Sequence, residues 1–256
     1  MSKRIAVLAA LYLCLGAAGA QQTSSTSRVS ATVRPEQHGG DFELGVLTQG
    51  GVGLTDNRNG YRFFMGGIHA GKILTNNIGP GVIRGNFEYA VELFPFWQSY
   101  TPITTRQNCV QIVGPVTGSV QASCSAPFSI GGTYTGVSIT PIILRWNFAG
   151  SERWQPWMQG GGGVIWTNHK YPPFGGPPVS TGGISLSPLG NNGPGSDTSV
   201  WNFTPQFGVG VHYFTRANRS VDLGANAVHI SSASLGDKNP GVNASVQFTL
   251  GYTWWK

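Results

Sequence analysis

The stretch 200–214, VWNFTPQFGVGVHYF, alternates between two kinds of side chain. Its odd-numbered positions, from Trp201 to Tyr213, are apolar, and its even-numbered positions, from Asn202 to His212, are polar or glycine. Successive side chains of a β-strand point to opposite faces, so this pattern predicts a strand with one apolar face and one polar face.

The same alternation recurs along the chain, and no long helical period follows Asp41. Within TPIILRW the apolar parity shifts around Pro141, which predicts a β-bulge at that point. We therefore predict eight strands, of which one covers 200–215 and the other seven cover roughly 42–54, 61–74, 84–97, 133–148, 154–167, 220–235 and 242–255.

The connections between these segments alternate in length. The second, fourth and sixth are the short turns TNNIGPG, AGSER and RANR, whereas two of the odd-numbered connections, roughly 98–132 and 168–199, are long. Outer-membrane barrels combine short periplasmic turns with long extracellular loops and place aromatic side chains at both membrane surfaces. We therefore predict an eight-stranded antiparallel transmembrane β-barrel over 41–256, although a secreted β-sandwich would also show the alternation.

The N-terminus carries a targeting signal. Lys3 and Arg4 precede an apolar run and a small-residue cleavage site that ends at Ala20, which predicts a signal peptide over 1–20. The following residues, 21–40, are rich in Ser, Thr and Gln and predict a flexible leader. A cleaved signal peptide and a transmembrane barrel together indicate the bacterial outer membrane.

Composition limits the partners and the chemistry. The chain has 16 basic residues and 10 acidic ones, and the cations are scattered rather than clustered, so we expect no nucleic-acid partner. After cleavage two cysteines remain, Cys109 and Cys124. In an oxidising compartment such a pair is expected to form one disulfide, because a metal pair would need nearby histidine or carboxylate ligands.

The seventh segment contains AVHISSASLGDKNPG, in which His229 and Ser231 share the parity of the lipid-facing apolar side chains. Exposing an imidazole and a hydroxyl group to hydrocarbon costs free energy. One interpretation places both groups at the depth of the lipid headgroups, where polar residues are ordinary. The other is that His229 is a base that activates Ser231 as a nucleophile. Ser232 and Ser234 fall on the interior parity, which makes Ser231 the better nucleophile.

HISSASLGDKNPG near the C-terminus resembles the PagL-type lipid A 3-O-deacylases, also described as acyloxyacyl hydrolases. The family pattern is His-x-Ser-Asn-Ala, followed by an Asn-Pro-Gly or Asn-Asp-Gly turn. The resemblance implies an eight-stranded outer-membrane barrel that removes the 3-linked acyl chain from lipid A of lipopolysaccharide, without a cofactor. It assigns His229 as the base and Ser231 as the nucleophile of a membrane-facing Ser-His-Glu site.

This sequence departs from the family pattern at two positions. Asn243 stands where the family has its acid, and Ser232 stands where the family has an asparagine linked with the oxyanion hole. The carbonyl of Asn243 can orient His229 but cannot stabilise an imidazolium as a carboxylate does, which leaves Asp237 in the turn as an alternative third member. Ser232 is a possible oxyanion donor beside backbone N–H groups. The alternative function is a non-catalytic barrel that serves structure or surface binding.

The remaining titratable side chains form no recognisable motif. The histidines other than His229 lack the spacing of metal ligands, so we expect no metal site; they are His38, His69, His169 and His212. Arg145 and His212 have interior parity, and we expect them to join Glu88 and Glu92 in a polar network that fills the barrel.

Overall fold

The computed structural model describes residues 37–107, 109–113, 120–173, 179–181, 184–186, 198–233 and 242–256. The expected signal peptide, most of the expected leader, Ser234 and Asp237 lie outside these ranges. None of the helices in the described part of the chain is long or apolar enough to cross a bilayer.

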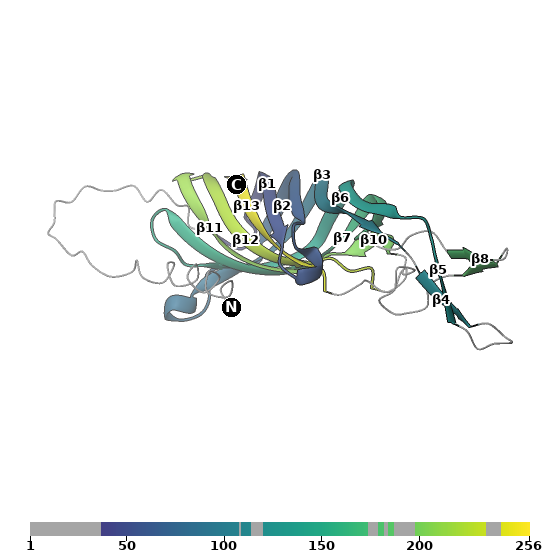
Figure 1. Cartoon of the computed structure of the whole chain (residues 1–256). Helices are drawn as coiled ribbons and strands as arrows, with labels where there is room; N and C mark the ends of the chain where they lie inside the picture. Colours follow the sequence, from purple (N-terminus) through teal and green to yellow (C-terminus); the bar gives the residue numbers. More distant parts are fainter. Residues whose placement is uncertain are drawn as a thin grey trace, which may run out of the picture. The chain divides into compact units, whose positions relative to one another are not determined.

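Long antiparallel strands lie side by side in the described part of the chain (Figure 1). Each pairs with its neighbours, and the last pairs with the first, so the sheet closes into an eight-stranded barrel. The predicted fold class is therefore confirmed. The strands are β1 (Phe42–Gly53), β2 (Arg62–Ile73), β3 (Gly85–Arg106), β6 (Phe128–Phe148), β7 (Trp154–Tyr171), β10 (Ser199–Phe203) continued by β11 (Gln206–Arg216), β12 (Arg219–His229) and β13 (Ala244–Trp255).

Several strands differ from the segments expected from the sequence. β3 and β6 extend further on the side of the long loop, where they remain paired as far as Arg106 and Phe128. The sixth strand is interrupted between β10 and β11 at Pro205, which has no N–H group to donate to a neighbouring strand. β12 ends at His229, so Ser231 lies just beyond it and not within it.

The predicted bulge lies in β6. The register between β6 and β7 shifts between Ile139 and Ile142, and the adjacent side chains of Pro141 and Ile142 both face outward. Gly161 and Gly163 of β7 allow the bulged backbone to approach. A Cβ atom on these glycines would lie 2.7 Å and 2.5 Å from the carbonyl oxygens of Ile142 and Ile139.

Apolar side chains cover the outside of the barrel, and polar side chains fill its middle. An apolar cluster lies toward the long-loop end of the barrel. It includes Tyr61, Phe63, Trp97, Tyr134 and Tyr171. A second cluster toward the short-turn end consists of Ile73, Phe214 and Trp255. Between them, a cavity of about 30 Å³ has room for water but not for an open channel.

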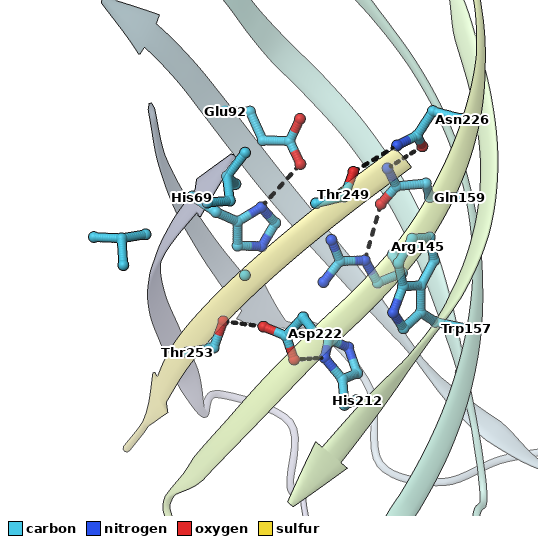
Figure 2. Close-up of a pocket in the computed structure, with 13 residues that line it drawn as sticks. His69, Glu92, Arg145, Trp157, Gln159, His212, Asp222, Asn226, Thr249 and Thr253 are labelled. Atoms are coloured by element: carbon cyan, nitrogen blue, oxygen red, sulfur yellow. Dashed lines mark hydrogen bonds and ion pairs between the residues drawn. The ribbon is translucent and has the colours of Figure 1, made fainter. Parts of the chain in front are cut away.

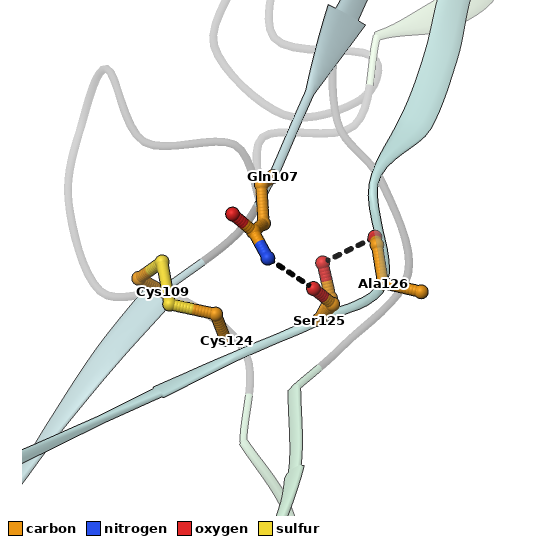
Figure 3. Close-up of a disulfide and its surroundings, with 5 residues drawn as sticks. All are labelled: Gln107, Cys109, Cys124, Ser125 and Ala126. Carbon is orange, nitrogen blue, oxygen red and sulfur yellow. Dashed lines mark hydrogen bonds between the residues drawn. A yellow bond between two sulfur atoms is a disulfide. The ribbon is translucent and has the colours of Figure 1, made fainter.

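The long connection between β3 and β6 contains the predicted disulfide. β4 (Cys109–Val113) and β5 (Val120–Cys124) form a separate hairpin, in which Cys109 pairs with Cys124 and is bonded to it (Figure 3). Beside the disulfide, the side-chain amide of Gln107 donates a hydrogen bond to the carbonyl oxygen of Ser125. A second small hairpin, in the next long connection, joins β8 (Val179–Thr181) to β9 (Ile184–Leu186).

Short helices and an ordered segment complete the ends of the barrel. The turn between β1 and β2 contains η1 (Asp56–Arg58), and the turn between β2 and β3 contains η2 (Gly81–Ile83). The last residues of the expected leader contact the barrel: Gln37 is buried, and its side-chain Oε1 accepts hydrogen bonds from the side-chain amides of Asn86 and Gln155.

Candidate active site

His229 is the last residue of β12, and backbone hydrogen bonds hold it on both sides. Its N–H group donates to the carbonyl oxygen of Pro205 at 3.0 Å, and it lies opposite Ala244 of β13. The next residue, Ile230, donates its N–H group to the carbonyl oxygen of Asn243 at 2.9 Å. The imidazole is partly exposed on the outer face, as its parity predicted.

Ser231 is held in register by Phe203, the last residue of β10. The N–H group of Phe203 donates to the carbonyl oxygen of Ser231 at 2.6 Å, and the reverse bond measures 3.0 Å. This pairing keeps Ser231 on the same face as His229 and leaves its side chain partly exposed. No hydrogen bond joins the two side chains in the described structure.

A sharp turn follows Ser231. Ala233 has a φ of 45°, in the left-handed region that side chains other than glycine seldom adopt. In this conformation the N–H group of Ala233 points back and donates to Oγ of Ser231 at 3.3 Å. A backbone donor therefore lies beside the candidate nucleophile, which is where an oxyanion would form.

A groove of about 350 Å³ opens next to His229 on the outer surface. Most of its walls are apolar side chains or bare backbone, and its dimensions suit an aliphatic chain. The lining residues are Leu54, Gly161, Pro205, Gln206, Phe207, Ala227, Val228, His229, Ala244 and Ser245.

Asn243 and Ser232 point into the barrel, away from His229. Each residue is only 1% exposed, and neither polar atom of the Asn243 amide has a hydrogen-bond partner among the described residues. Asn243 precedes β13, but its carbonyl oxygen is already bonded to Ile230, so the alternation of the strand extends to it and directs its side chain inward. The structure therefore brings His229 and Ser231 together on one face and does not bring Asn243 to His229.

Arg145 organises the charged middle of the barrel (Figure 2). Its Nη1 donates to Oε1 of Glu43 at 2.9 Å and to Oε1 of Glu88 at 3.3 Å, and its Nε donates to Gln159 at 3.0 Å. The guanidinium group also lies 4.9 Å from the ring centroid of Trp157. Arg145 therefore joins Glu88 in an internal polar network, as predicted from the sequence.

Two glycines make room for the indole that supports Arg145. A Cβ atom at Gly210 of β11 would lie 2.2 Å from the Trp157 ring, and one at Gly224 of β12 would lie 2.7 Å from it. Any larger residue at either position would displace Trp157 from this place.

Glu92 and His212 are the other two predicted members of the network, and they have different partners. His69 contacts Glu92 at 3.3 Å and is hydrogen-bonded to Glu43. His212 pairs with Asp222 at 2.6 Å, so it does not join Arg145 directly. The sequence analysis missed three members of the network: Glu43, His69 and Asp222. Two of them, Glu43 and Asp222, could have been found, because they occupy interior positions in the alternation of their strands, as Glu88 does.

One group in this interior has the donor atoms of a metal site. The ligand atoms of Glu43, His69 and Glu88 lie within 4.8 Å of one another, and all three residues are buried. The guanidinium group of Arg145 already donates to both carboxylates and supplies the positive charge there. We therefore assign these residues to an internal ion-pair network.

The chain is similar to known outer-membrane proteins. The model of the family described as lipid A 3-O-deacylase (PagL) matches residues 118–253. The crystal structure of the outer membrane enzyme PagL is 16% identical and covers 82% of this chain and 98% of its own, with a TM-score of 0.42. The Neisserial surface protein A (NspA) is 12% identical and covers 84% and 96%, with a TM-score of 0.43. A comparison with curated proteins finds no match.

Proposed function

The chain belongs to the PagL family of lipid A 3-O-deacylases, and we propose that it is an esterase that removes the 3-linked acyl chain from lipid A in the outer membrane. The observation that carries this proposal is the position of His229 and Ser231, which share the membrane-facing side beside an apolar groove. Lipid A is the ester-bearing lipid that such a site would meet in the outer leaflet.

The reaction proceeds through an acyl-enzyme. His229 removes the proton of Ser231, whose Oγ attacks the ester carbonyl carbon and forms a tetrahedral oxyanion. Collapse of this intermediate breaks the bond to the sugar oxygen, which takes the proton from His229 and leaves as the free 3-hydroxyl group. Water, deprotonated by His229, then hydrolyses the acyl-enzyme and releases the fatty acid.

The oxyanion is stabilised by the backbone and not by the Ser232 hydroxyl group. The Ala233 N–H group is within 3.3 Å of Oγ of Ser231, whereas the Ser232 side chain is buried on the opposite face. A preorganised backbone donor of this kind is worth about 10²- to 10³-fold in rate.

We propose Asp237, and not Asn243, as the residue that orients His229. The Asn243 side chain faces the barrel interior, and a carboxylate stabilises the developing imidazolium better than an amide does. Asp237 follows Ser231 by six positions, in the connection to β13.

The test is mass spectrometry of lipid A from cells that produce the protein or its variants. The wild type is expected to remove one ester-linked acyl chain, and Ser231→Ala to reduce this to background. His229→Ala is expected to lower the rate by about 10²- to 10⁴-fold. Ser232→Ala is the matched control and should retain activity within about threefold, because its hydroxyl group lies inside the barrel.

Unchanged acylation by the wild type in a host that has the 3-linked ester would refute the proposal. The chain would then be a non-catalytic member of the family that serves structure or surface binding. That alternative is favoured by one observation: no carboxylate of the described residues contacts His229. The disulfide-linked hairpin of β4 and β5 would be its first candidate for a binding surface.

A further inference from the structure

The short-turn end of the barrel carries a strong excess of positive charge. This is the periplasmic end, because the long loops lie at the opposite end. Only two acidic residues of the described chain lie near its surface, Asp41 and Glu152. Six basic residues lie there, and we call them the basic ring: Lys72, Arg84, Arg153, Arg216, Arg219 and Lys256.

None of the six forms an ion pair with a carboxylate of the described residues. Five are exposed and Arg219 is partly exposed. Of the two acids, Asp41 is already engaged, since its Oδ2 accepts a hydrogen bond from the N–H group of His38 at 2.8 Å. No carboxylate of the described residues therefore neutralises the charge of the ring.

Two members of the ring lie on the lipid-facing side, each beside an aromatic ring on the neighbouring strand. Lys72 is opposite Phe42, and its Nζ lies 5.0 Å from the centroid of the phenyl ring. Arg219 is opposite Trp254. Long cationic side chains at such positions lay their stems along apolar surface and extend their charged heads to the headgroup region.

An exposed apolar turn lies between Lys72 and Arg84. It contains four large aliphatic residues that are at least half exposed. Val82 of η2 is 92% exposed, so the described chain leaves this side chain almost uncovered. The four are Leu74, Ile78, Val82 and Ile83. An apolar turn flanked by cations suits the boundary between acyl chains and headgroups.

We propose that the basic ring binds the phosphate groups of anionic phospholipids in the periplasmic leaflet of the outer membrane. This interaction goes beyond deacylation, which takes place at the opposite end of the barrel. Each lysine or arginine near a membrane surface strengthens the attraction of anionic lipid by about fivefold. The ring anchors the depth of the barrel, and thereby the height of His229 and Ser231 in the outer leaflet.

The arrangement of the ring favours lipid over a periplasmic protein. Its members lie at the β2–β3, β6–β7 and β11–β12 turns or at the strand ends beside them, and directly after β13, which places them around the circumference of the barrel. Lipids surround a barrel on all sides, whereas a protein partner would contact one side. The ring also continues the lipid-facing band, in which Leu44 of β1 is 56% exposed.

The test is native mass spectrometry of the full-length mature protein released from detergent and titrated with phosphatidylglycerol or phosphatidylcholine. The wild type is expected to bind phosphatidylglycerol about 25-fold more tightly, which is about fivefold for each of Lys72 and Arg219, and high salt should reduce this difference. The variant K72Q/R219Q should lose most of the difference. The matched control R62Q/K170Q removes two cations at the long-loop end and should keep it.

Heat-dependent mobility in gel electrophoresis confirms first that both variants are folded barrels. Equal affinities of the wild type for the two lipids would overturn the proposal and would leave the ring to an acidic periplasmic macromolecule. An equal loss in K72Q/R219Q and R62Q/K170Q would also overturn it, because the preference would then come from overall charge. Neither outcome depends on deacylase activity.

Discussion

Replacing Arg145 by methionine removes the only arginine from the buried network and keeps the length of the side chain. Among the described residues, the change leaves the carboxylates of Glu43 and Glu88 without the guanidinium that lies 2.9 Å and 3.3 Å from them. It also leaves Oε1 of Gln159 without its donor. Both glutamates are buried in the middle of the barrel, so the charges that lose their partner stay largely desolvated.

The expected loss follows from these contacts. Removing one partner of a buried ion pair costs about 3–5 kcal/mol, because the remaining charge stays desolvated. The lost hydrogen bond to Gln159 adds about 1 kcal/mol. We therefore expect Arg145→Met to lower the free energy of unfolding by about 4–6 kcal/mol. Neutralising both acids as well, in R145M/E43Q/E88Q, should recover at least half of that loss.

The measurement is equilibrium unfolding in urea of barrels inserted into lipid vesicles, followed by tryptophan fluorescence. Arg62→Met is the matched control, since Arg62 is exposed and its replacement should change the free energy of unfolding by less than about 0.5 kcal/mol. A loss below about 1 kcal/mol for Arg145→Met would refute the assignment of Arg145 as the organising charge. A triple variant no more stable than Arg145→Met would refute the electrostatic origin of the loss.

Three further outcomes are expected. Asp237→Asn should lower the rate of deacylation by about a hundredfold or more. Asn243→Glu should destabilise the barrel without raising activity, because it buries a carboxylate in the interior. A gain in activity from Asn243→Glu in the lipid A assay would make position 243, and not Asp237, the one that orients His229. Cys109→Ser/Cys124→Ser should change the urea transition of the barrel by less than about 0.5 kcal/mol, because the hairpin is separate from the barrel sheet; a larger shift would place the hairpin in the same cooperative unit. Ala227→Trp should fill the groove and slow deacylation by about tenfold or more while the fold is retained, and an unchanged rate would separate the groove from the site.

The sequence alone predicted the barrel and the faces of its strands. Alternation with a period of two is a local property. It assigns Trp201 and Asn202 to opposite faces of the strand without any information about the neighbouring strands. The same rule placed His229 and Ser231 on the membrane side, and it located the bulge at Pro141 from the shift in parity. The disulfide followed from composition, since the assignment of Cys14 to the expected signal peptide left Cys109 with one possible partner.

The tertiary structure decided which interior side chains meet. Glu43 and Arg145 are 102 residues apart and lie on strands that do not pair with each other, so no local pattern could connect them. Their contact depends on how the strands are staggered when the sheet closes. His212 is hydrogen-bonded instead to Asp222, which lies directly opposite it on the neighbouring strand.

The tertiary structure also decided the direction of Asn243. From sequence, Asn243 reaches His229 only if it precedes the regular alternation of the last strand. A single backbone hydrogen bond from Ile230 extends that alternation by one residue, and this turns the Asn243 side chain into the barrel. Parity along a strand is local and can be predicted from sequence, but the residue at which the strand begins is set by hydrogen bonds to its neighbours, which only the folded sheet provides.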